Sequence, residues 1–169
     1  MIKEKVVLEN VAPEEAADAI IKKLEEWHVC FKDMPSSMCA DNSDFHSVKN
    51  AKILVAGGRG IGTADYFEVL KELANILNGE ISSSRANVDA GWVGVNRQVG
   101  QTSNIVSPEL YLALGISGTP QHLAGIKGAK HIIAINKRKD APIFSVAELC
   151  IVADLHEVVP VLISKLKNA

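Results

Sequence analysis

The stretch Ile53-Leu54-Val55-Ala56-Gly57-Gly58-Arg59-Gly60 decides the fold class. Its four apolar residues, Ile53 to Ala56, predict a strand buried on both faces, because a half-exposed strand would alternate apolar and polar residues. The glycines that follow predict a turn in which the backbone can approach a ligand closely. An amphipathic helix is expected next, over Tyr66 to Leu77, so the local pattern is strand, polar loop, helix.

The same pattern recurs along the chain. Further short apolar strands are expected at Lys5 to Leu8, Glu80 to Ser83, Leu110 to Leu114, Ile132 to Ile135 and Cys150 to Ala153. Helices are expected from Pro13, with its apolar face running through Trp27, and over Leu155 to Leu166. Apolar strands alternating with helices predict an α/β fold, a doubly wound parallel sheet of the Rossmann-like kind.

The stretch from Phe31 to Lys49 breaks this pattern, because it is polar and rich in turn-forming residues. We interpret it as a loop or linker. The chain is then expected to divide into residues 1–50, a strand, helix and linker leading into the domain, and residues 51–169, the domain itself.

Composition excludes several classes of function. The 169 residues carry a formal net charge of −2, so no broad basic field is available for nucleic acid. No apolar run approaches the roughly 20 residues that span a bilayer. Cys30, Cys39 and Cys150 are odd in number and lack the C-x-x-C spacing, which favours free thiols in a reducing compartment. We expect no metal site, because no His, Cys, Asp and Glu cluster has metal-ligand spacing.

Polar residues gather where the predicted strands end. In parallel sheets, ligands bind beyond the carboxyl ends of the strands. Six such ends are expected, at Ala56 to Gly62, Ser82 to Ala86, Gln98 to Thr102, Gly115 to His122, Asn136 and Asp154. Together they predict a long groove with glycines, two arginines and many neutral donors. Such a groove suits a large cofactor that carries its own chemistry.

Common nucleotide and hydrolase motifs are missing from these loops. The spacing Gly58-x-Gly60-x-Gly62 is not the dinucleotide G-x-G-x-x-G, and no Lys-Ser/Thr pair of a P-loop follows it. No G-x-S-x-G elbow is present, which argues against an α/β-hydrolase.

Taken in order, the loops resemble a known family. The segments GGRG, SSRANVDAGWV, RQVGQTSNIVSPELYLALGISGTPQHLAGIKGAKHIIAINK, APIF and IVADLHEVVP resemble the FAD-binding domain of electron-transfer flavoprotein alpha subunits. The resemblance covers about Ala51 to Leu166. The first 50 residues resemble the family only loosely, and we expect its usual larger N-terminal domain to be lacking here.

The resemblance implies FAD as the cofactor and suggests a role for each loop. Arg59 would contact the phosphate region, and Ser84 would lie near the flavin with Arg85 over the isoalloxazine ring. Val99, Gly100, Gln101 and Thr102 would line the flavin, with Thr102 near its N5.

The remaining implied contacts belong to the last three loops. His122 would reach the flavin O2, within a segment that wraps the ribityl chain and ring: Ser117, Gly118, Thr119, Pro120, Gln121 and His122. Asn136, Asp154 and Leu155 would hold the adenosine end. The sequence departs from the family where Thr119-Pro120 stands for the usual Ala-Ile and where Ser103 stands for a common glycine, and Pro120 offers no N–H.

Arg85, Thr102 and His122 are the expected flavin-tuning residues. Positive charge or hydrogen-bond donors beside the ring favour the anionic reduced flavin, so we expect Arg85 and His122 to raise its potential. No catalytic residue is assigned, because the family carries electrons and does not turn over a substrate of its own.

The resemblance also implies partners and a compartment. Electrons would come from acyl-CoA or other dehydrogenases and pass to a quinone reductase or another acceptor, with an electron-transfer flavoprotein beta subunit completing a heterodimer. We expect the bacterial cytoplasm, with the mitochondrial matrix as the alternative.

Two other functions stay open at this point. The chain could be a nicotinamide dinucleotide-binding domain of an oxidoreductase, in which Glu80 follows the glycine loop at the distance of a ribose-binding acid. It could also be a non-redox interaction module that kept the fold and lost the cofactor.

Overall fold

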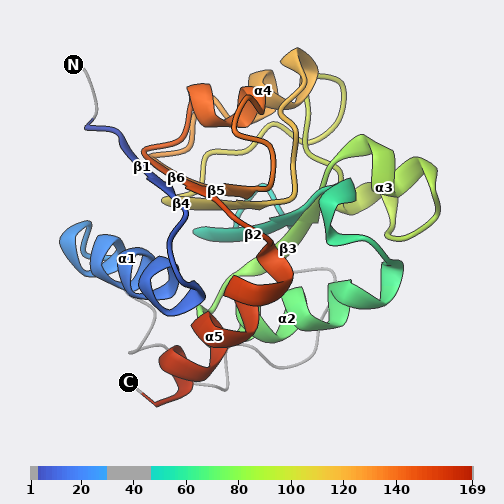
Figure 1. Cartoon of the computed structure of the whole chain (residues 1–169). Helices are drawn as coiled ribbons and strands as arrows, with labels where there is room; N and C mark the ends of the chain where they lie inside the picture. The colour runs from blue at the N-terminus through green and yellow to red at the C-terminus, as the bar shows by residue number, and fades with distance from the viewer. Residues whose placement is uncertain (1–3, 30–46, 169) are drawn as a thin grey trace.

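The computed structural model describes residues 4–29 and 47–168 and places six parallel strands of that part in one sheet. The strands are β1 (Val6–Glu9), β2 (Ile53–Gly57), β3 (Glu80–Ser83), β4 (Leu110–Leu114), β5 (His131–Asn136) and β6 (Leu149–Val152). Their order across the sheet is β1-β6-β5-β4-β2-β3 (Figure 1). The predicted α/β architecture with a doubly wound parallel sheet is confirmed.

Helices cover both faces of the sheet. The long ones, α1 (Pro13–Glu26), α2 (Phe67–Ile76) and α5 (Leu155–Lys167), lie together on one face, whereas the short α4 (Pro120–Gly125) lies on the other (Figure 1). A second short helix, α3 (Arg85–Asp89), follows β3. Single 3₁₀ turns occur at η2 (Arg59–Ile61), η3 (Ala64–Tyr66), η4 (Val95–Arg97) and η5 (Pro142–Ser145).

The central strand β2 shows why the sequence specifies two cores. Ile53 and Val55 belong to the core under α1, α2 and α5, while Leu54 and Ala56 belong to the core under α4. Because successive side chains of a strand point to opposite faces, only a continuous apolar run satisfies both cores.

The N-terminal strand and helix share this architecture. Strand β1 pairs in parallel with β6 at the edge of the sheet, and α1 packs against α5. Helix α1 begins at Pro13, whose missing N–H costs nothing at the first helical position. The division of the chain at residue 50 stays a proposal. Most of the expected Phe31–Lys49 linker, together with Cys30 and Cys39, lies outside the described residues.

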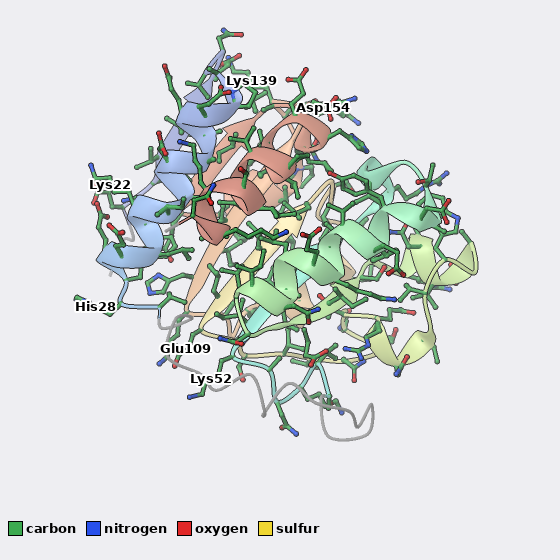
Figure 2. All side chains as sticks on the ribbon, turned by 90° about the horizontal axis from the view of Figure 1, so that it is seen from below. Lys22, His28, Lys52, Glu109, Lys139 and Asp154 are labelled. Carbon is green, nitrogen blue, oxygen red and sulfur yellow. The ribbon has the colours of Figure 1, made fainter. Side chains whose placement is uncertain are left out.

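The amino ends of the parallel strands lie at one end of the molecule, and their carboxyl ends lie at the other. Figure 2 shows Asp154 and Lys139 at one end, and His28, Glu109 and Lys52 at the other. Lys139 and Asp154 follow β5 and β6, whereas Lys52 and Glu109 precede β2 and β4. The carboxyl ends of the strands, where ligands are expected, are therefore those near Asp154.

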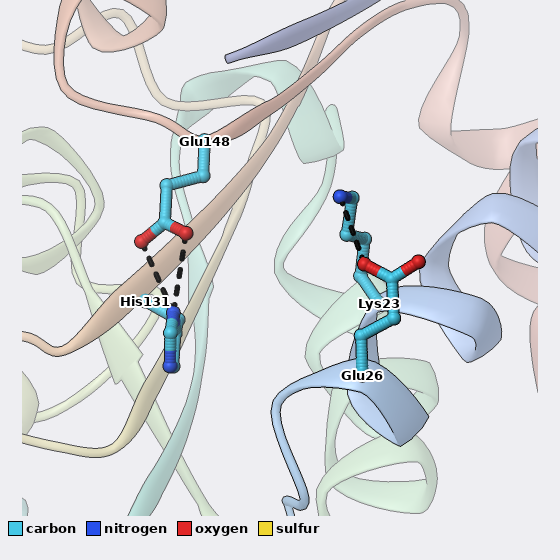
Figure 3. A network of polar contacts seen from close by, with 4 residues as sticks. All are labelled: Lys23, Glu26, His131 and Glu148. Atoms are coloured by element: carbon cyan, nitrogen blue, oxygen red, sulfur yellow. Dashed lines mark hydrogen bonds and ion pairs between the residues drawn. The ribbon is translucent and has the colours of Figure 1, made fainter. Parts of the chain in front are cut away.

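Aromatic and charged side chains gather where helix α1 ends, beside the amino ends of β5 and β6. The Trp27 ring stacks on His131 with 4.2 Å between ring centroids and an angle of 6° between their planes. The carboxylate of Glu148 contacts Nδ1 of His131 at 3.1 and 3.2 Å, and Lys23 pairs with Glu26 at 3.0 Å (Figure 3). This cluster lies at the end of the sheet opposite the predicted groove.

One expected strand end is wrong. The segment Gln98 to Thr102 does not end a strand of the sheet, but lies in the irregular connection between α3 and β4 and forms only isolated bridges. Its polar residues and Gly100 offer no apolar face that a full strand could bury. The segment nevertheless reaches the sheet, because Gln98 bridges to Ser83 at the end of β3.

Candidate functional site

The strand order places a switch point at the carboxyl end of β2. From β2, the chain passes through α2 to β3 on one side, and β4 lies on the other side. Loops that leave neighbouring strands in opposite directions open a crevice there, which is where ligands bind in doubly wound sheets. A cavity of about 660 Å³ lies at this place, within the usual range for ligand pockets.

The cavity is lined by loops that follow β2, β3 and β4 and by the connection around Gly100. Twelve of the sixteen residues predicted to bind the cofactor are among its lining residues, namely Arg59, Ser84, Arg85, Val99, Gly100, Gln101, Thr102, Ser117, Gly118, Thr119, Gln121 and His122. The structure thus brings together four loops that are up to 63 positions apart in the chain, from Arg59 to His122.

Glycines let the cavity walls meet backbone to backbone. A Cβ atom on Gly58 would lie 2.4 Å from the carbonyl oxygen of Gly115, so the β2 and β4 loops touch without side chains between them. At Gly118, a Cβ would lie 2.5 Å from the backbone nitrogen of Ile143, and its φ of +90° disfavours any other residue. The cradle therefore depends on glycine at both places.

Backbone hydrogen bonds fix the loop that carries Gly100. The Val99 N–H donates to the Ser83 carbonyl at 3.0 Å, which ties the loop to β3. The Gln101 N–H donates to the Gln121 carbonyl at 2.8 Å, which ties it to α4. A loop held at both ends keeps the side chains of Gln101 and Thr102, both exposed, at the mouth of the cavity.

Ser84 and Arg85 stand at the start of α3. Ser84 is the N-cap residue of α3 but makes no capping hydrogen bond, and its buried Oγ has no hydrogen-bond partner. Arg85 is exposed and pairs with Asp89 one helical turn later, at 3.4 Å between Nε and Oδ2. Both charged groups line the cavity, so Arg85 already lies beside the space a ligand would fill.

His122 is the buried titratable group of the site, with 5% of its surface exposed. Burial lowers its pKa to about 4, and the backbone of Val99 opposes this shift without forming a hydrogen bond of good geometry. At neutral pH the imidazole is therefore neutral. His122 contributes a dipole to the cavity where the sequence analysis allowed for a charge.

Four predicted residues do not line the cavity: Pro120, Asn136, Asp154 and Leu155. Asn136 donates from Nδ2 to the Ile116 carbonyl at 2.9 Å and thereby holds the loop after β4. Leu155 is buried beneath Gly115. Pro120 is the first residue of α4 and lies at the surface.

Asp154 serves the chain itself in this structure. It caps α5 by accepting from the N–H of His156 at 2.9 Å, and its carboxylate also contacts the His156 ring at 2.8 Å and Lys137 at 3.4 Å. Partial burial acts to raise the pKa of Asp154, but the hydrogen bonds from His156 and the charge of Lys137 outweigh it and hold the pKa low.

Two contributors escaped the sequence analysis. Asp89 lies inside the SSRANVDAGWV segment, but only the helical spacing to Arg85 hints at their pairing. Tyr111, which contacts His122, is the one polar-tipped residue in the apolar run of β4. Within residues 4–29 and 47–168, no three His, Cys, Asp or Glu residues are grouped to hold a metal, and no helix there is long and apolar enough to cross a membrane.

The fold and the cavity together define a parallel α/β domain with a ligand-sized cavity at its switch point. Residues 47–127 match the family model described as "Electron transfer flavoprotein FAD-binding domain". This part of the chain therefore belongs to the family of electron transfer flavoprotein FAD-binding domains, as the sequence motifs predicted.

Curated relatives of the chain are named electron transfer flavoprotein subunit alpha. The chain is 50% identical over 132 residues to the electron transfer flavoprotein subunit alpha of Thermoanaerobacterium thermosaccharolyticum, covering 78% of this chain and 40% of that protein. It is 52% identical over 126 residues to the subunit alpha of Clostridium acetobutylicum, covering 75% and 38%. For the mitochondrial subunit alpha of Dictyostelium discoideum, identity is 49% over 127 residues, covering 75% and 36%.

The chain thus spans about two fifths of the length of these curated relatives. Among solved structures, the Vibrio vulnificus NanR protein complexed with ManNAc-6P aligns with 92% of this chain and 60% of its own, at 13% identity and a TM-score of 0.36. A TM-score this low supports no conclusion about fold or function.

Proposed function

We propose that this chain binds FAD in the cavity at the switch point and acts as the flavin-bearing part of an electron carrier. The observation that carries this proposal is the assembly of twelve predicted cofactor contacts around one cavity. The membership of residues 47–127 in a family of FAD-binding domains supports the same cofactor.

The donor set fits a dinucleotide flavin. Ser84 Oγ and His122 Nδ1 are buried polar atoms without partners, and each would gain a hydrogen bond from a polar ligand. Glycine at positions 58 and 118 lets the loops around the cavity pack backbone to backbone. Arg59 and Arg85 supply positive charge for phosphates or for an electron-rich ring.

Each residue then has a limited task, because bound FAD itself supplies the acceptance and release of electrons. The glycine walls and the pinned loop at Gly100 would hold the cofactor in one position. Arg85 would place positive charge beside it, and Thr102 and His122 would offer neutral donors. These groups favour an electron-rich flavin and so raise its potential. Asn136, Asp154 and Leu155 remain proposed contacts for the adenosine end.

A nicotinamide dinucleotide is the less favoured cofactor. The acid required for that function would have to stand at the carboxyl end of a strand. Glu80 instead begins β3, at the opposite end of the sheet, and pairs with Arg97 at 3.0 Å. The position of Glu80 and its ion pair with Arg97 therefore favour a structural role.

Partners and compartment follow from the relatives as further proposals. Because these relatives are named subunit alpha, we propose that an electron transfer flavoprotein beta subunit binds this chain. Acyl-CoA or other dehydrogenases would supply electrons, and a quinone reductase or another acceptor would take them. We propose the bacterial cytoplasm as compartment, with the mitochondrial matrix as the alternative, since the relatives include bacterial and mitochondrial proteins.

The test of the cofactor is a comparison of ligands on the purified chain. We expect FAD to raise the melting temperature and to remain with the protein through desalting, giving the visible bands of oxidised flavin. NAD at the same concentration should leave the melting temperature unchanged. A colourless protein stabilised by NAD but not by FAD would reverse the assignment, and binding of neither would favour the interaction module.

A further inference from the structure

A buried hydrogen bond lies behind the wall of the cavity. The hydroxyl of Tyr111, the second residue of β4, is 2.8 Å from Nε2 of His122 on α4. Tyr111 is fully buried and His122 nearly so. The rings are tilted by 57° with their centroids 6.0 Å apart, so the contact is a hydrogen bond between ring edges and not a stack.

The core that contains this tyrosine also contains small side chains. Tyr111 lies in the core under α4, together with the small side chains of Ala56 and Ala113. Ser82 is paired with Ala56 across the sheet, and its hydroxyl acts to lower the pKa of Tyr111. Burial is the larger effect and raises that pKa, so Tyr111 keeps its proton at neutral pH.

The hydroxyl proton of Tyr111 has one well-placed acceptor. Ser82 Oγ makes no hydrogen bond of good geometry, which leaves Nε2 of His122 as the acceptor. If Nε2 carried the imidazole proton, it would donate to the tyrosine oxygen and leave the hydroxyl proton with only Ser82 Oγ, which is not placed for a hydrogen bond of good geometry. Because a buried hydroxyl without a good acceptor costs free energy, the tautomer with its proton on Nδ1 is favoured by roughly 5- to 150-fold.

The preferred tautomer therefore carries its proton on Nδ1. That nitrogen is buried and without a partner of good geometry, and it belongs to a residue that lines the cavity. His122 then has a fixed, neutral N–H at Nδ1.

We propose that Tyr111 is a positioning residue for the cofactor site: its buried hydroxyl donates to Nε2 of His122 and fixes the imidazole as the Nδ1–H tautomer. This inference rests on the proposed function for its consequence, since the N–H would be offered to an acceptor atom of the flavin. The tautomer itself belongs to the chain and can be measured without any cofactor.

The first test is the ¹⁵N NMR spectrum of the His122 ring in cofactor-free protein at pH 7. We expect Nδ1 to have the shift of a protonated nitrogen and Nε2 that of an acceptor. In Tyr111→Phe, the ratio of the Nδ1–H tautomer to the Nε2–H tautomer should fall by the same roughly 5- to 150-fold, because Nε2 then has no hydrogen-bond partner in either tautomer. A wild-type imidazole protonated on Nε2 overturns the proposal, and so does an unchanged ratio in the variant.

Tyr66→Phe is the matched control. Tyr66 also lies beside a histidine, with 4.6 Å between its ring centroid and that of His156, but its buried hydroxyl makes no hydrogen bond. Removing this hydroxyl should leave the His122 tautomer unchanged. A change as large as that of Tyr111→Phe would mean that general loosening, and not the Tyr111 hydrogen bond, sets the tautomer.

The second test adds FAD. If the competent tautomer falls to about half of the population in Tyr111→Phe, the dissociation constant of FAD should rise about twofold, since only that fraction binds fully. The midpoint potential of the bound flavin should also fall. Wild-type protein that binds FAD with its imidazole protonated on Nε2 refutes the role of Tyr111 and leaves the proposed function standing. Protein that has the predicted tautomer but does not bind FAD supports the role of Tyr111 in setting the tautomer and refutes the proposed function.

Discussion

Burying a neutral histidine makes this fold sensitive to acid. In the unfolded chain, His122 has the ordinary pKa of 6.5, whereas in the folded chain burial lowers its pKa to about 4. Between these two pH values the unfolded state binds more protons, so the free energy of unfolding falls as pH falls. Below about pH 4 both states are protonated at this site and the loss from His122 stops.

The size of the effect follows from these two values. Each unit between the folded and unfolded pKa is equivalent to about 1.4 kcal/mol, so His122 alone should remove about 3 kcal/mol of stability between pH 7.5 and pH 4. This is a large fraction of the roughly 5–15 kcal/mol that stabilise a typical domain. Because His122 is only 5% exposed, solvent screening reduces the figure little.

The assay is urea unfolding followed by far-UV circular dichroism at a series of pH values. In His122→Gln the side chain cannot titrate, so the stability of the wild type should fall about 3 kcal/mol further than that of the variant. Tyr111→Phe is the control: it keeps the buried imidazole and should keep most of the pH dependence, since burial is the main cause. Parallel curves for wild type and His122→Gln would refute the reasoning.

Three further predictions concern the cavity. Gly118→Ala should lower stability by several kcal/mol and abolish FAD binding, because its Cβ would meet a backbone nitrogen at 2.5 Å. Gly91→Ala is the control, since Gly91 has a φ of +77° but open space around it, and it should cost only about 1–2 kcal/mol. Thermal and urea unfolding measure both variants. Asn136→Ala should cost about 1–3 kcal/mol by leaving the Ile116 carbonyl without its partner, measured by urea unfolding. Arg85→Ala should lower the midpoint potential of bound FAD in a spectroscopic redox titration, and an unchanged potential with FAD bound would remove Arg85 from the tuning residues.

The local pattern of the sequence predicted the sheet well. Strands β3 and β4 have the expected bounds, and β1, β2, β5 and β6 differ from expectation by one residue at one or both ends. Such runs are predictable because a strand buried on both faces must be apolar throughout. The strand order, which creates the switch point, is a matter of non-local pairing that no local pattern encodes.

The site was predictable only in part, for the same reason. Glycines and polar residues at strand ends marked the cavity loops in advance. The pairing of Tyr111 with His122 joins two residues eleven positions apart on different elements, and the sequence shows only a tyrosine in an apolar run. Asp154 stays a proposed contact for the adenosine end, and its contacts with His156 and Lys137 are not visible in the sequence.

The central claim is that the switch-point cavity binds FAD. The most direct measurement is a titration of the ¹⁵N-labelled chain with FAD, followed by amide NMR. The account predicts saturation at one FAD per chain, with the largest shifts at Ser84, Gly100 and Ser117 and little change at Lys52 and Glu109 at the opposite end of the sheet. Shifts confined to that opposite end, or no saturable shift at all, would contradict it.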